Sequence, residues 1–296
     1  MTLREALVAA RERLVGAGVA PQEAAIDVDL YARTILGWDR ARLLTEHLSP
    51  APSDLEPRLS EWISRRARRE PSAYIIGVRE FWGLDFIVTP AVLIPRPETE
   101  FVVEESLALV RALAAPRIAD IGTGSGCIAV SLSHEMTQAH VVATDVSAEA
   151  LDIARRNAER HGVAARIEFV AASYLGGIEG DFDLIAANPP YVRDGDKPAL
   201  APDVRYEPDV ALFGGTRGLR DIEGVLETAT AKLRPHGWLV MEFGFGQEDD
   251  VRALVAERST LDVVRVREDL QGLARTAIIR KAAGGSIQQD PPYKRL

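Results

Sequence analysis

The sequence is poor in the features that mark secreted and membrane-bound proteins. Cys127 is the only cysteine among 296 residues. It cannot form an internal disulfide, so we expect a reducing, cytoplasmic location. No apolar run approaches the roughly 18 residues that a membrane-spanning helix needs, so we expect no membrane partner. Charges interrupt the apolar stretch of the first 18 residues, which argues against a secretory signal.

A basic surplus is also lacking. The formal net charge is −9 at pH 7, whereas proteins that bind nucleic acid through phosphates usually carry a basic surplus or a basic face. We therefore expect no direct nucleic-acid binding. The one basic cluster comprises Arg65, Arg66, Arg68 and Arg69. We interpret it as a solvated helix face, and a docking patch for an acidic partner is the alternative.

The residues that are present predict two domains. Hydrophobic residues make up 47% of the chain, enough for a proper core. Apolar residues at helical spacing predict an N-terminal helical bundle over residues 1–79. Aromatic and β-branched residues mixed with glycine and proline predict a β-hairpin linker over 80–98. Residues 99–283 should form the second domain, and 284–296 should form a flexible tail.

The second domain alternates helical segments with short apolar strands, which predicts an α/β fold with a doubly wound, mostly parallel sheet covered on both faces. The last two strands have only a short connection, so they should pair antiparallel at one edge. The seven predicted strands are RIADIG, HVVATD, RIEFV, FDLIAA, WLVMEF, LDVVRVR and RTAIIRK.

A glycine-rich turn joins the first of these strands to a helix. Gly122, Gly124 and Gly126 allow a tight reversal and close approach of the backbone to a ligand. Asp145 ends the next strand, where an acid can hold the ribose hydroxyls of a nucleoside cofactor. Its alternative role is to cap the following helix, for which Ser147 is available. A dinucleotide site usually reads G-x-G-x-x-G, so this G-x-G-x-G run favours S-adenosylmethionine over NAD.

A second motif, Asn-Pro-Pro-Tyr at residues 188–191, stands where the strand FDLIAA stops. Its two prolines lack backbone N–H donors, so the strand cannot continue. In a doubly wound sheet this strand lies beside the first one, so Asn188 should face the cofactor crevice. The Asn188 side-chain oxygen and the Pro189 carbonyl can then accept both hydrogens of one NH2 group. Pro190 completes the turn, and Tyr191 can stack on the planar group.

This arrangement suits methyl transfer to nitrogen. A carboxamide nitrogen is a weak nucleophile because its lone pair is delocalised into the carbonyl. Two acceptors return electron density to the nitrogen, aim its lone pair and stabilise the positive charge that develops. The exocyclic amine of adenine is equally planar, so the same motif also allows an adenine-N6 methyltransferase that acts on DNA or RNA.

Longer segments resemble the protein-glutamine N5-methyltransferases of peptide chain release factors, the PrmC/HemK family. The segments are PSAYIIGVREFWGLDFIVTPAVLIPRPETE, IADIGTGSGCIAVSLS, ATDVSAEALDIARRNAERHGV, FDLIAANPPYV, YEPDVALFGGTRGLRDI and LVMEFGFGQ. The resemblance implies a helical bundle, a hairpin linker and a class I methyltransferase domain. It also implies methylation of the glutamine in the Gly-Gly-Gln motif of class I release factors, with S-adenosylmethionine as methyl donor.

The resemblance assigns further roles to individual residues. The loop from Gly122 through Thr123, Gly124 and Ser125 to Gly126 would line the cofactor, and Asp145 would hold its ribose. Residues 188–191 would bind the substrate glutamine, and Asn188 would also contact the cofactor. Residues 96–100 would close over the methionine end. Two departures stand out: Ala73 replaces a glutamine that the family often has, and Ala172 and Ser173 replace an acidic and a large residue that line adenine. Ser173, or Tyr174 in its place, would then contact adenine.

Three alternatives remain. An adenine-N6 methyltransferase usually needs a basic groove and a recognition domain, which this acidic chain does not show. A non-catalytic scaffold that binds S-adenosylmethionine would not require the Asn188 motif. A nicotinamide dehydrogenase is a more distant third. We expect no metal ion, and a monomer that binds its release factor transiently.

Overall fold

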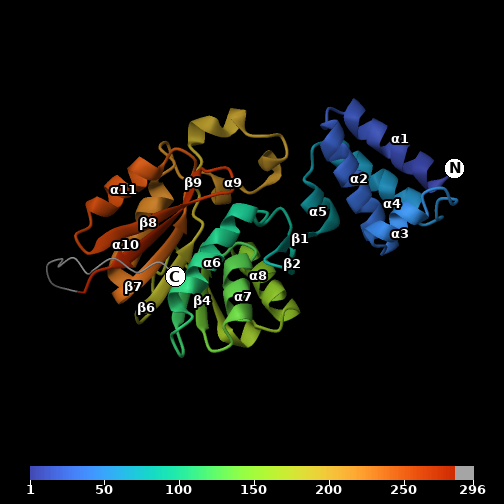
Figure 1. Cartoon of the computed structure of the whole chain (residues 1–296). Coiled ribbons are helices and arrows are strands. Elements are labelled where there is room, and N and C mark those ends of the chain that lie inside the picture. Colours follow the sequence, from blue (N-terminus) through green and yellow to red (C-terminus); the bar gives the residue numbers. More distant parts are fainter. Residues whose placement is uncertain (284–296) are drawn as a thin grey trace. The chain divides into compact units, whose positions relative to one another are not determined.

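Two separately packed units make up the computed structural model, which describes residues 1–283. The first unit contains Met1–Val78 together with Leu200–Tyr206, and the second contains Arg79–Ala199 and the chain from Glu207 onward (Figure 1). The predicted tail, 284–296, lies outside the described residues, and the predicted boundaries at residues 79 and 98 stay a prediction. None of the helices in residues 1–283 is long and apolar enough to cross a membrane.

The first unit is helical, as its apolar spacing predicts. Thr2 and Glu5 form a capping box at the first helix, Pro21 opens the second in its first turn, and Gly37 ends it with a left-handed φ of 64°. The core includes an edge-to-face pair of Tyr31 and Trp62, whose ring centroids lie 5.4 Å apart. The helices are α1 (Leu3–Gly16), α2 (Pro21–Leu36), α3 (Arg40–Thr45), α4 (Leu55–Ala67) and α5 (Ser72–Ile76).

The interpretation of the arginine cluster as a solvated helix face is wrong for Arg66. This side chain follows the buried stripe of α4 through Trp62 and Ile63, and only 3% of it is exposed. Its Nε donates to Asp27 Oδ2 at 2.7 Å, and the guanidinium also pairs with Glu23. The reason is helical periodicity, which places position 66 on the same face as the apolar residues one turn earlier.

The segment Leu200–Tyr206 is far from α4 in sequence but packs with it. The Tyr206 hydroxyl donates to the Arg68 carbonyl at 2.6 Å. One Asp203 carboxylate oxygen lies 3.9 Å from Arg66 and the other lies 3.9 Å from Arg69. No sequence pattern predicts this association, because the two partners are separated by more than a hundred residues and neither forms a motif.

The predicted hairpin is present and is packed onto the second unit. Strands β1 (Val78–Phe81) and β2 (Leu84–Ile87) are joined by two residues with positive φ, Trp82 at 55° and Gly83 at 70°, as a type I′ turn requires. Phe81 and Phe86 are buried against α6 and α7 in one core of the unit. The hairpin is therefore part of a packed core, which a simple linker would not be.

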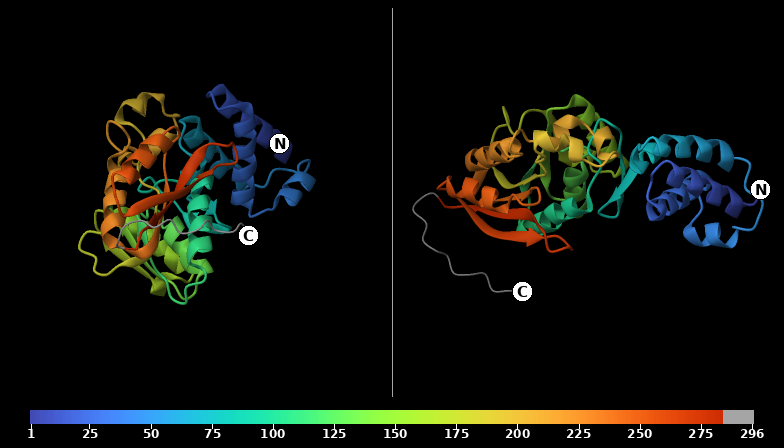
Figure 2. Two further views of the ribbon diagram at one scale, coloured as in Figure 1. Left: turned by 60° about the vertical axis from the view of Figure 1, so that its left-hand side comes forward. Right: turned by 90° about the horizontal axis from the view of Figure 1, so that it is seen from above.

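The second unit contains the predicted doubly wound sheet with its covering helices (Figures 1 and 2). The strand order is β5-β4-β3-β6-β7-β9-β8. The pairs β3–β4, β4–β5, β3–β6 and β6–β7 are parallel, whereas β7–β9 and β9–β8 are antiparallel. This confirms the predicted fold class and the antiparallel edge. The strands are β3 (Arg117–Ile121), β4 (His140–Asp145), β5 (Ile167–Ala171), β6 (Phe182–Ala187), β7 (Leu233–Glu242), β8 (Leu261–Glu268) and β9 (Ala274–Lys281).

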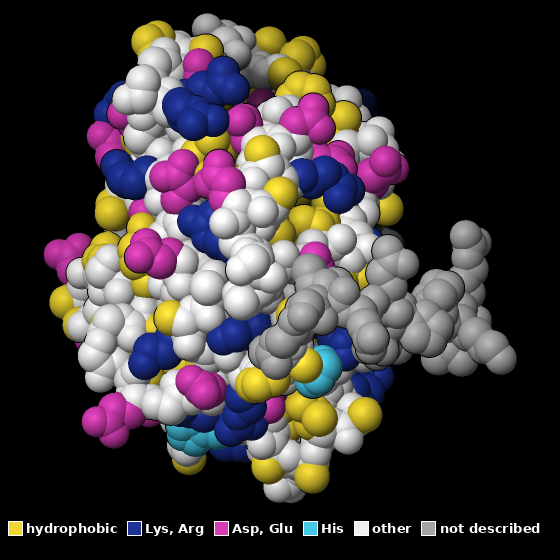
Figure 3. Space-filling view, turned by 90° about the vertical axis from the view of Figure 1, so that its left-hand side faces the viewer, with side chains coloured by type: hydrophobic (Ala, Val, Ile, Leu, Met, Phe, Trp, Pro, Cys, Tyr) yellow, Lys and Arg dark blue, Asp and Glu magenta, His cyan; other side chains and the backbone are white. Residues whose placement is uncertain are grey.

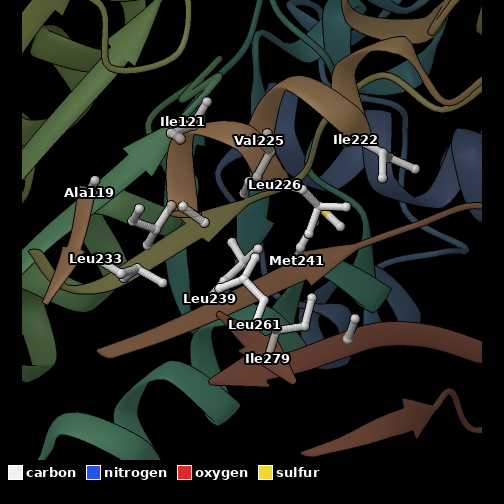
Figure 4. Packing of buried hydrophobic residues seen from close by; sticks show 14 of the residues in the cluster. Ala119, Ile121, Ile222, Val225, Leu226, Leu233, Leu239, Met241, Leu261 and Ile279 are labelled. Carbon is white, nitrogen blue, oxygen red and sulfur yellow. The ribbon is translucent and has the colours of Figure 1, made fainter. Parts of the chain in front are cut away.

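Helices cover both faces of this sheet, because successive strand residues point to opposite sides. In β6, Leu184 packs towards α6 (Glu100–Val110), α7 (Cys127–Glu135) and α8 (Ala148–Arg160), whereas Ile185 packs towards α10 (Arg220–Lys232) and α11 (Glu248–Ala256). Figure 4 shows the core between the sheet and α10, on the face towards which Ile185 points. Ile222, Val225 and Leu226 of α10 face strand residues such as Leu239 there. A short helix, α9 (Asp209–Leu212), and the 3-10 turns η1 (Pro97–Thr99), η2 (Ala164–Arg166), η3 (Asp194–Ala199) and η4 (Val204–Tyr206) complete the described chain.

Candidate functional site

The glycine loop lies between β3 and α7, where parallel strands offer their carboxyl ends. All three glycines have positive φ: 71° at Gly122, 54° at Gly124 and 81° at Gly126. A Cβ atom on Gly122 would meet nothing within 4 Å, whereas one on Gly126 would lie 3.1 Å from the Cβ of Ala154. Gly122 therefore leaves open space for a ligand, and Gly126 permits close packing of the loop on α8.

Asp145 ends β4 and faces the same loop. Its Oδ2 accepts from the Gly124 N–H at 2.9 Å, and its Oδ1 accepts from the Ser147 N–H at 2.9 Å. The cap of α8 is Ser147 itself, whose hydroxyl accepts from the Ala150 N–H at 3.1 Å, so the alternative role of Asp145 as the cap is wrong. A carboxylate has about four acceptor sites, so two backbone bonds leave capacity for ribose hydroxyls.

The Asn-Pro-Pro-Tyr motif begins where β6 ends, directly beside β3. The Asn188 Nδ2 donates to the Thr99 hydroxyl at 2.9 Å. The Tyr191 hydroxyl donates to Glu242 Oε1 at 3.1 Å. Burial raises the pKa of Tyr191, and the nearby Glu242 carboxylate raises it further, so the phenol remains a neutral donor.

One cavity brings the two motifs together. The glycine loop 122–126, Asp145, Ser173 and the motif 188–191 contain eleven predicted residues. Nine of them line the cavity: Gly122, Thr123, Gly124, Ser125, Asp145, Ser173, Asn188, Pro189 and Pro190. Gly126 and Tyr191 do not line it: the first packs on Ala154, and the second is held by Glu242. Asn188 thus faces the same cavity as Asp145, which is the arrangement that the strand order implies.

Segments far apart in sequence form the remaining wall of this cavity. Residues 91–93 and Arg96 line it from one side, and Pro208, Val210 and Ala211 line it from another. Glu207 joins the two segments, since its Oε2 accepts from the Ile94 N–H at 3.1 Å and its Oε1 pairs with Arg96 at 2.5 Å. Within the segment that the resemblance implied, Arg96 and Thr99 line the cavity, while Glu100 accepts from the Trp82 N–H.

Sequence reasoning missed three polar residues at or near the cavity: Asp120, Glu207 and Glu242. Asp120 is fully buried, and its Oδ2 accepts from the Thr123 hydroxyl at 2.6 Å and the Ala129 N–H at 3.1 Å. Burial raises the pKa of Asp120 to about 7. The available signal was an acidic residue inside or at the end of an apolar strand, as in IADIG and VMEF. Such a residue must be satisfied internally.

The cavity fits a nucleoside that carries a polar arm. Gly122 gives open backbone at the loop, and the Asp145 carboxylate matches a pair of ribose hydroxyls. Ser173 lines a further part of the cavity together with Tyr174 and Asp221. The Tyr174 hydroxyl donates to Asp221 Oδ1 at 3.1 Å, which fixes the phenol ring at this wall.

Comparison with known proteins agrees with this geometry. Residues 5–77 match the model of the PrmC N-terminal domain, and residues 102–203 match the methyltransferase small domain. A release factor glutamine methyltransferase of Nitratidesulfovibrio vulgaris is 42% identical over 285 residues, covering 95% of both chains. Another, of Koribacter versatilis, is 38% identical over 284 residues, covering 95% of this chain and 99% of the other.

Solved structures show a shared fold. The hMettl16 catalytic domain in complex with a MAT2A 3'UTR hairpin is 17% identical, with a TM-score of 0.56 over 85% of this chain and 88% of that chain. A methyltransferase of Pyrococcus furiosus is 20% identical, with a TM-score of 0.51 over 69% of this chain and 91% of that chain. With relatives about 40% identical over nearly its whole length, this chain belongs to the family of release factor glutamine methyltransferases.

Proposed function

We propose that the chain transfers a methyl group from S-adenosylmethionine to the side-chain nitrogen of the glutamine in the Gly-Gly-Gln motif of class I release factors. The observation that carries this proposal is the shared cavity of Asn188, Pro189 and Asp145. It unites a pair of NH2 acceptors with a carboxylate suited to ribose. The relatives are release factor glutamine methyltransferases, and this supplies the substrate class.

The cofactor end of the cavity would hold the methyl donor. Residues 122–125 would contact its amino-acid arm and Asp145 its ribose, while Ser173, Tyr174 and Asp221 would contact its base. When bound, S-adenosylmethionine supplies a methyl group on a positively charged sulfur. Because Asp145 is already fixed by two backbone N–H groups, its carboxylate needs little reorganisation to receive the ribose.

At the substrate end, the chain would orient a planar amide. The Asn188 side-chain oxygen and the Pro189 carbonyl would accept its two hydrogens and hold the nitrogen towards the donor. Neither Pro189 nor Pro190 has an N–H, so no local backbone donor competes for these acceptors. The two oxygens also stabilise the positive charge that develops on nitrogen, and the proton can leave to water after transfer.

The exocyclic amine of adenine would satisfy the same two acceptors. Against it stand the net charge of −9 and the mixture of Lys and Arg with Asp and Glu side chains on the face shown in Figure 3. A nucleic-acid substrate would favour a predominantly basic surface. Adenine-containing DNA and RNA therefore belong in the test as competing substrates.

The test is methyl transfer from labelled S-adenosylmethionine, with the modified residue mapped by mass spectrometry. We expect one methyl group on the glutamine of the Gly-Gly-Gln motif, none when that glutamine is replaced by asparagine, and none on the nucleic acids. Asn188→Ala should lower kcat by about 100-fold or more, because one of two preorganised acceptors is lost. Its Kd for the cofactor should stay within about threefold of wild type. Methylation of adenine instead of glutamine would overturn the proposal.

A further inference from the structure

A buried carboxylate lies behind the Asn188 motif without lining the cavity. Glu242 ends β7, and only 1% of it is exposed. Its Oε2 accepts from the Thr99 hydroxyl at 2.7 Å, and its Oε1 accepts from the Tyr191 hydroxyl at 3.1 Å. Thr99 is also buried, and its hydroxyl oxygen accepts from Asn188 Nδ2 at 2.9 Å. A continuous chain of hydrogen bonds thus runs from Glu242 through Thr99 to Asn188.

The direction of this chain follows from the number of hydrogens. An ionised carboxylate can only accept, and a threonine hydroxyl has a single hydrogen. When Thr99 donates that hydrogen to Glu242, its oxygen can only accept from Asn188. The amide of Asn188 must then turn its NH2 group to Thr99, and Oδ1 becomes the opposite end of the amide. In the flipped amide, Asn188 Oδ1 would face the lone pairs of the Thr99 hydroxyl oxygen. The buried hydrogen bond between Asn188 and Thr99 would then be lost.

We propose that Glu242 and Thr99 are positioning residues for methyl transfer, which hold the Asn188 amide so that its oxygen is the atom offered to the substrate NH2 group. The inference rests on the proposed function, because an NH2 substrate needs an acceptor. An Asn188 amide in the opposite orientation would present a second NH2 group and repel the substrate.

The charge state of Glu242 controls this orientation. Burial raises the pKa of Glu242 to about 7, the bonds from Thr99 and Tyr191 lower it, Glu98 of η1 raises it and Arg275 of β9 lowers it. Burial raises the pKa of the Cys127 thiol of α7 to about 12, and the Asp120 and Glu242 carboxylates raise it further.

Above its pKa, Glu242 only accepts hydrogen bonds. Below its pKa, the carboxyl group gains an O–H that can donate to Thr99. Thr99 can then donate to Asn188, and the whole chain can reverse. Turnover should therefore fall as the pH drops through about 7.

Substitutions at Thr99 test the link directly, provided that each variant keeps the wild-type unfolding transition. Thr99→Val removes the hydroxyl at nearly constant shape and should lower kcat about tenfold, which corresponds to the loss of one buried hydrogen bond. Thr99→Ser restores the hydroxyl and should stay within about twofold of wild type. The Kd of S-adenosylmethionine should change by less than about threefold in either variant, because the Thr99 hydroxyl is bonded to Glu242 and Asn188. Equal losses in Thr99→Val and Thr99→Ser, or no loss in Thr99→Val, would overturn the proposal.

Glu242→Gln tests the direction of the chain. Glutamine is nearly isosteric, but it can both donate and accept, so it supports either orientation at every pH. We expect a loss in kcat of a few fold at pH 8 and no further loss between pH 8 and pH 6, where the wild-type rate declines. A wild-type pH profile that persists in Glu242→Gln would assign the titration to another group and contradict the inference.

A readout without turnover separates this inference from the proposed function. The side-chain NH2 resonances of Asn188, assigned by their loss in Asn188→Ala, should titrate with a midpoint near pH 7 in the wild type. They should not titrate in Glu242→Gln. If these resonances behave as expected while release factor is not methylated, the proposed function fails and the positioning role stands. If release factor is methylated but the Asn188 NH2 resonances do not shift in Thr99→Val, only the positioning role fails.

Discussion

Each glycine of the loop after β3 has a positive φ, but the space around the missing Cβ atom differs among them. Gly122 faces open space at the cavity, whereas Gly126 packs on the backbone and side chain of Ala154. The sequence predicts the turn from all three glycines together. It does not predict that Gly122 leaves open space while Gly126 allows close packing, because the neighbour of Gly126 comes from α8, a separate element.

Two alanine substitutions should separate ligand space from packing. Gly122→Ala should lower the free energy of unfolding by about 1–2 kcal/mol, because alanine at this position must adopt the left-handed backbone conformation. It should also weaken the binding of S-adenosylmethionine, because its methyl group would occupy the open space at the cavity. Gly126→Ala should lose about 1–3 kcal/mol more, because its Cβ would overlap Ala154. Urea unfolding and calorimetric titration measure the two quantities. Equal unfolding free energies for the two variants would contradict this division.

At the scale of elements, one side chain of α8 holds two other segments of the chain. The Asn157 amide is fully buried, accepts from the Ile87 N–H at 2.7 Å and donates to the Ile87 carbonyl at 3.0 Å. It also donates to the Ser125 carbonyl of the glycine loop at 2.8 Å. The side chain therefore continues the hydrogen bonding of β2 and links the hairpin to the glycine loop through one helix.

Asn157→Ala should destabilise the fold and weaken cofactor binding together. Several buried backbone groups would lose their partner, at about 1–3 kcal/mol for each group left unsatisfied. The Kd of S-adenosylmethionine should rise because the Ser125 segment loses its anchor. Thermal unfolding and calorimetric titration provide the measurements. Arg155→Ala, an exposed position on the same helix, is the matched control and should change stability by less than about 0.5 kcal/mol. Unchanged cofactor affinity in Asn157→Ala would disprove the link to the loop.

Element types and both cavity motifs could be predicted from the sequence, because hydrophobic periodicity and adjacent motif residues encode them. The rules for doubly wound sheets also predicted that the strand before Asn188 lies beside the first strand. The supporting polar contacts could not. Thr99 and Glu242 are 143 positions apart, and Ile87 and Asn157 are 70 positions apart. Such partners belong to no local pattern, and only the folded sheet brings them together. The same reason explains Arg66, which looks like a surface charge until α2 covers it.

At the scale of the whole molecule, the described cavity residues all belong to the second unit. The first unit contains a buried ion pair between Arg66 and Asp27, on which its stability depends. Arg66 is held by Asp27 and by the Glu70 carbonyl, and Asp27 also accepts from the Ser72 hydroxyl at 2.6 Å. Buried pairs of this kind are costly to break from one side, because the remaining charge has lost its compensation.

Asp27→Ala should therefore destabilise the first unit by about 3 kcal/mol or more, while the affinity for S-adenosylmethionine stays unchanged. Calorimetric unfolding reports the first quantity and equilibrium titration the second. Glu23→Gln offers a control, since its more exposed partnership with Arg66 should be worth about 1 kcal/mol or less. A loss of cofactor affinity in Asp27→Ala would show that the two units are coupled more tightly than their separate cores indicate.

The association of Leu200–Tyr206 with the helical unit has a consequence for how the protein can be recombined. The backbone passes between the units after Val78, after Ala199 and after Tyr206. A chimaera that exchanges only residues 1–78 with those of a relative would leave the segment Leu200–Tyr206 packed against helices of the other protein. The interchangeable module is discontinuous, and an exchange that preserves its native interface must carry both pieces.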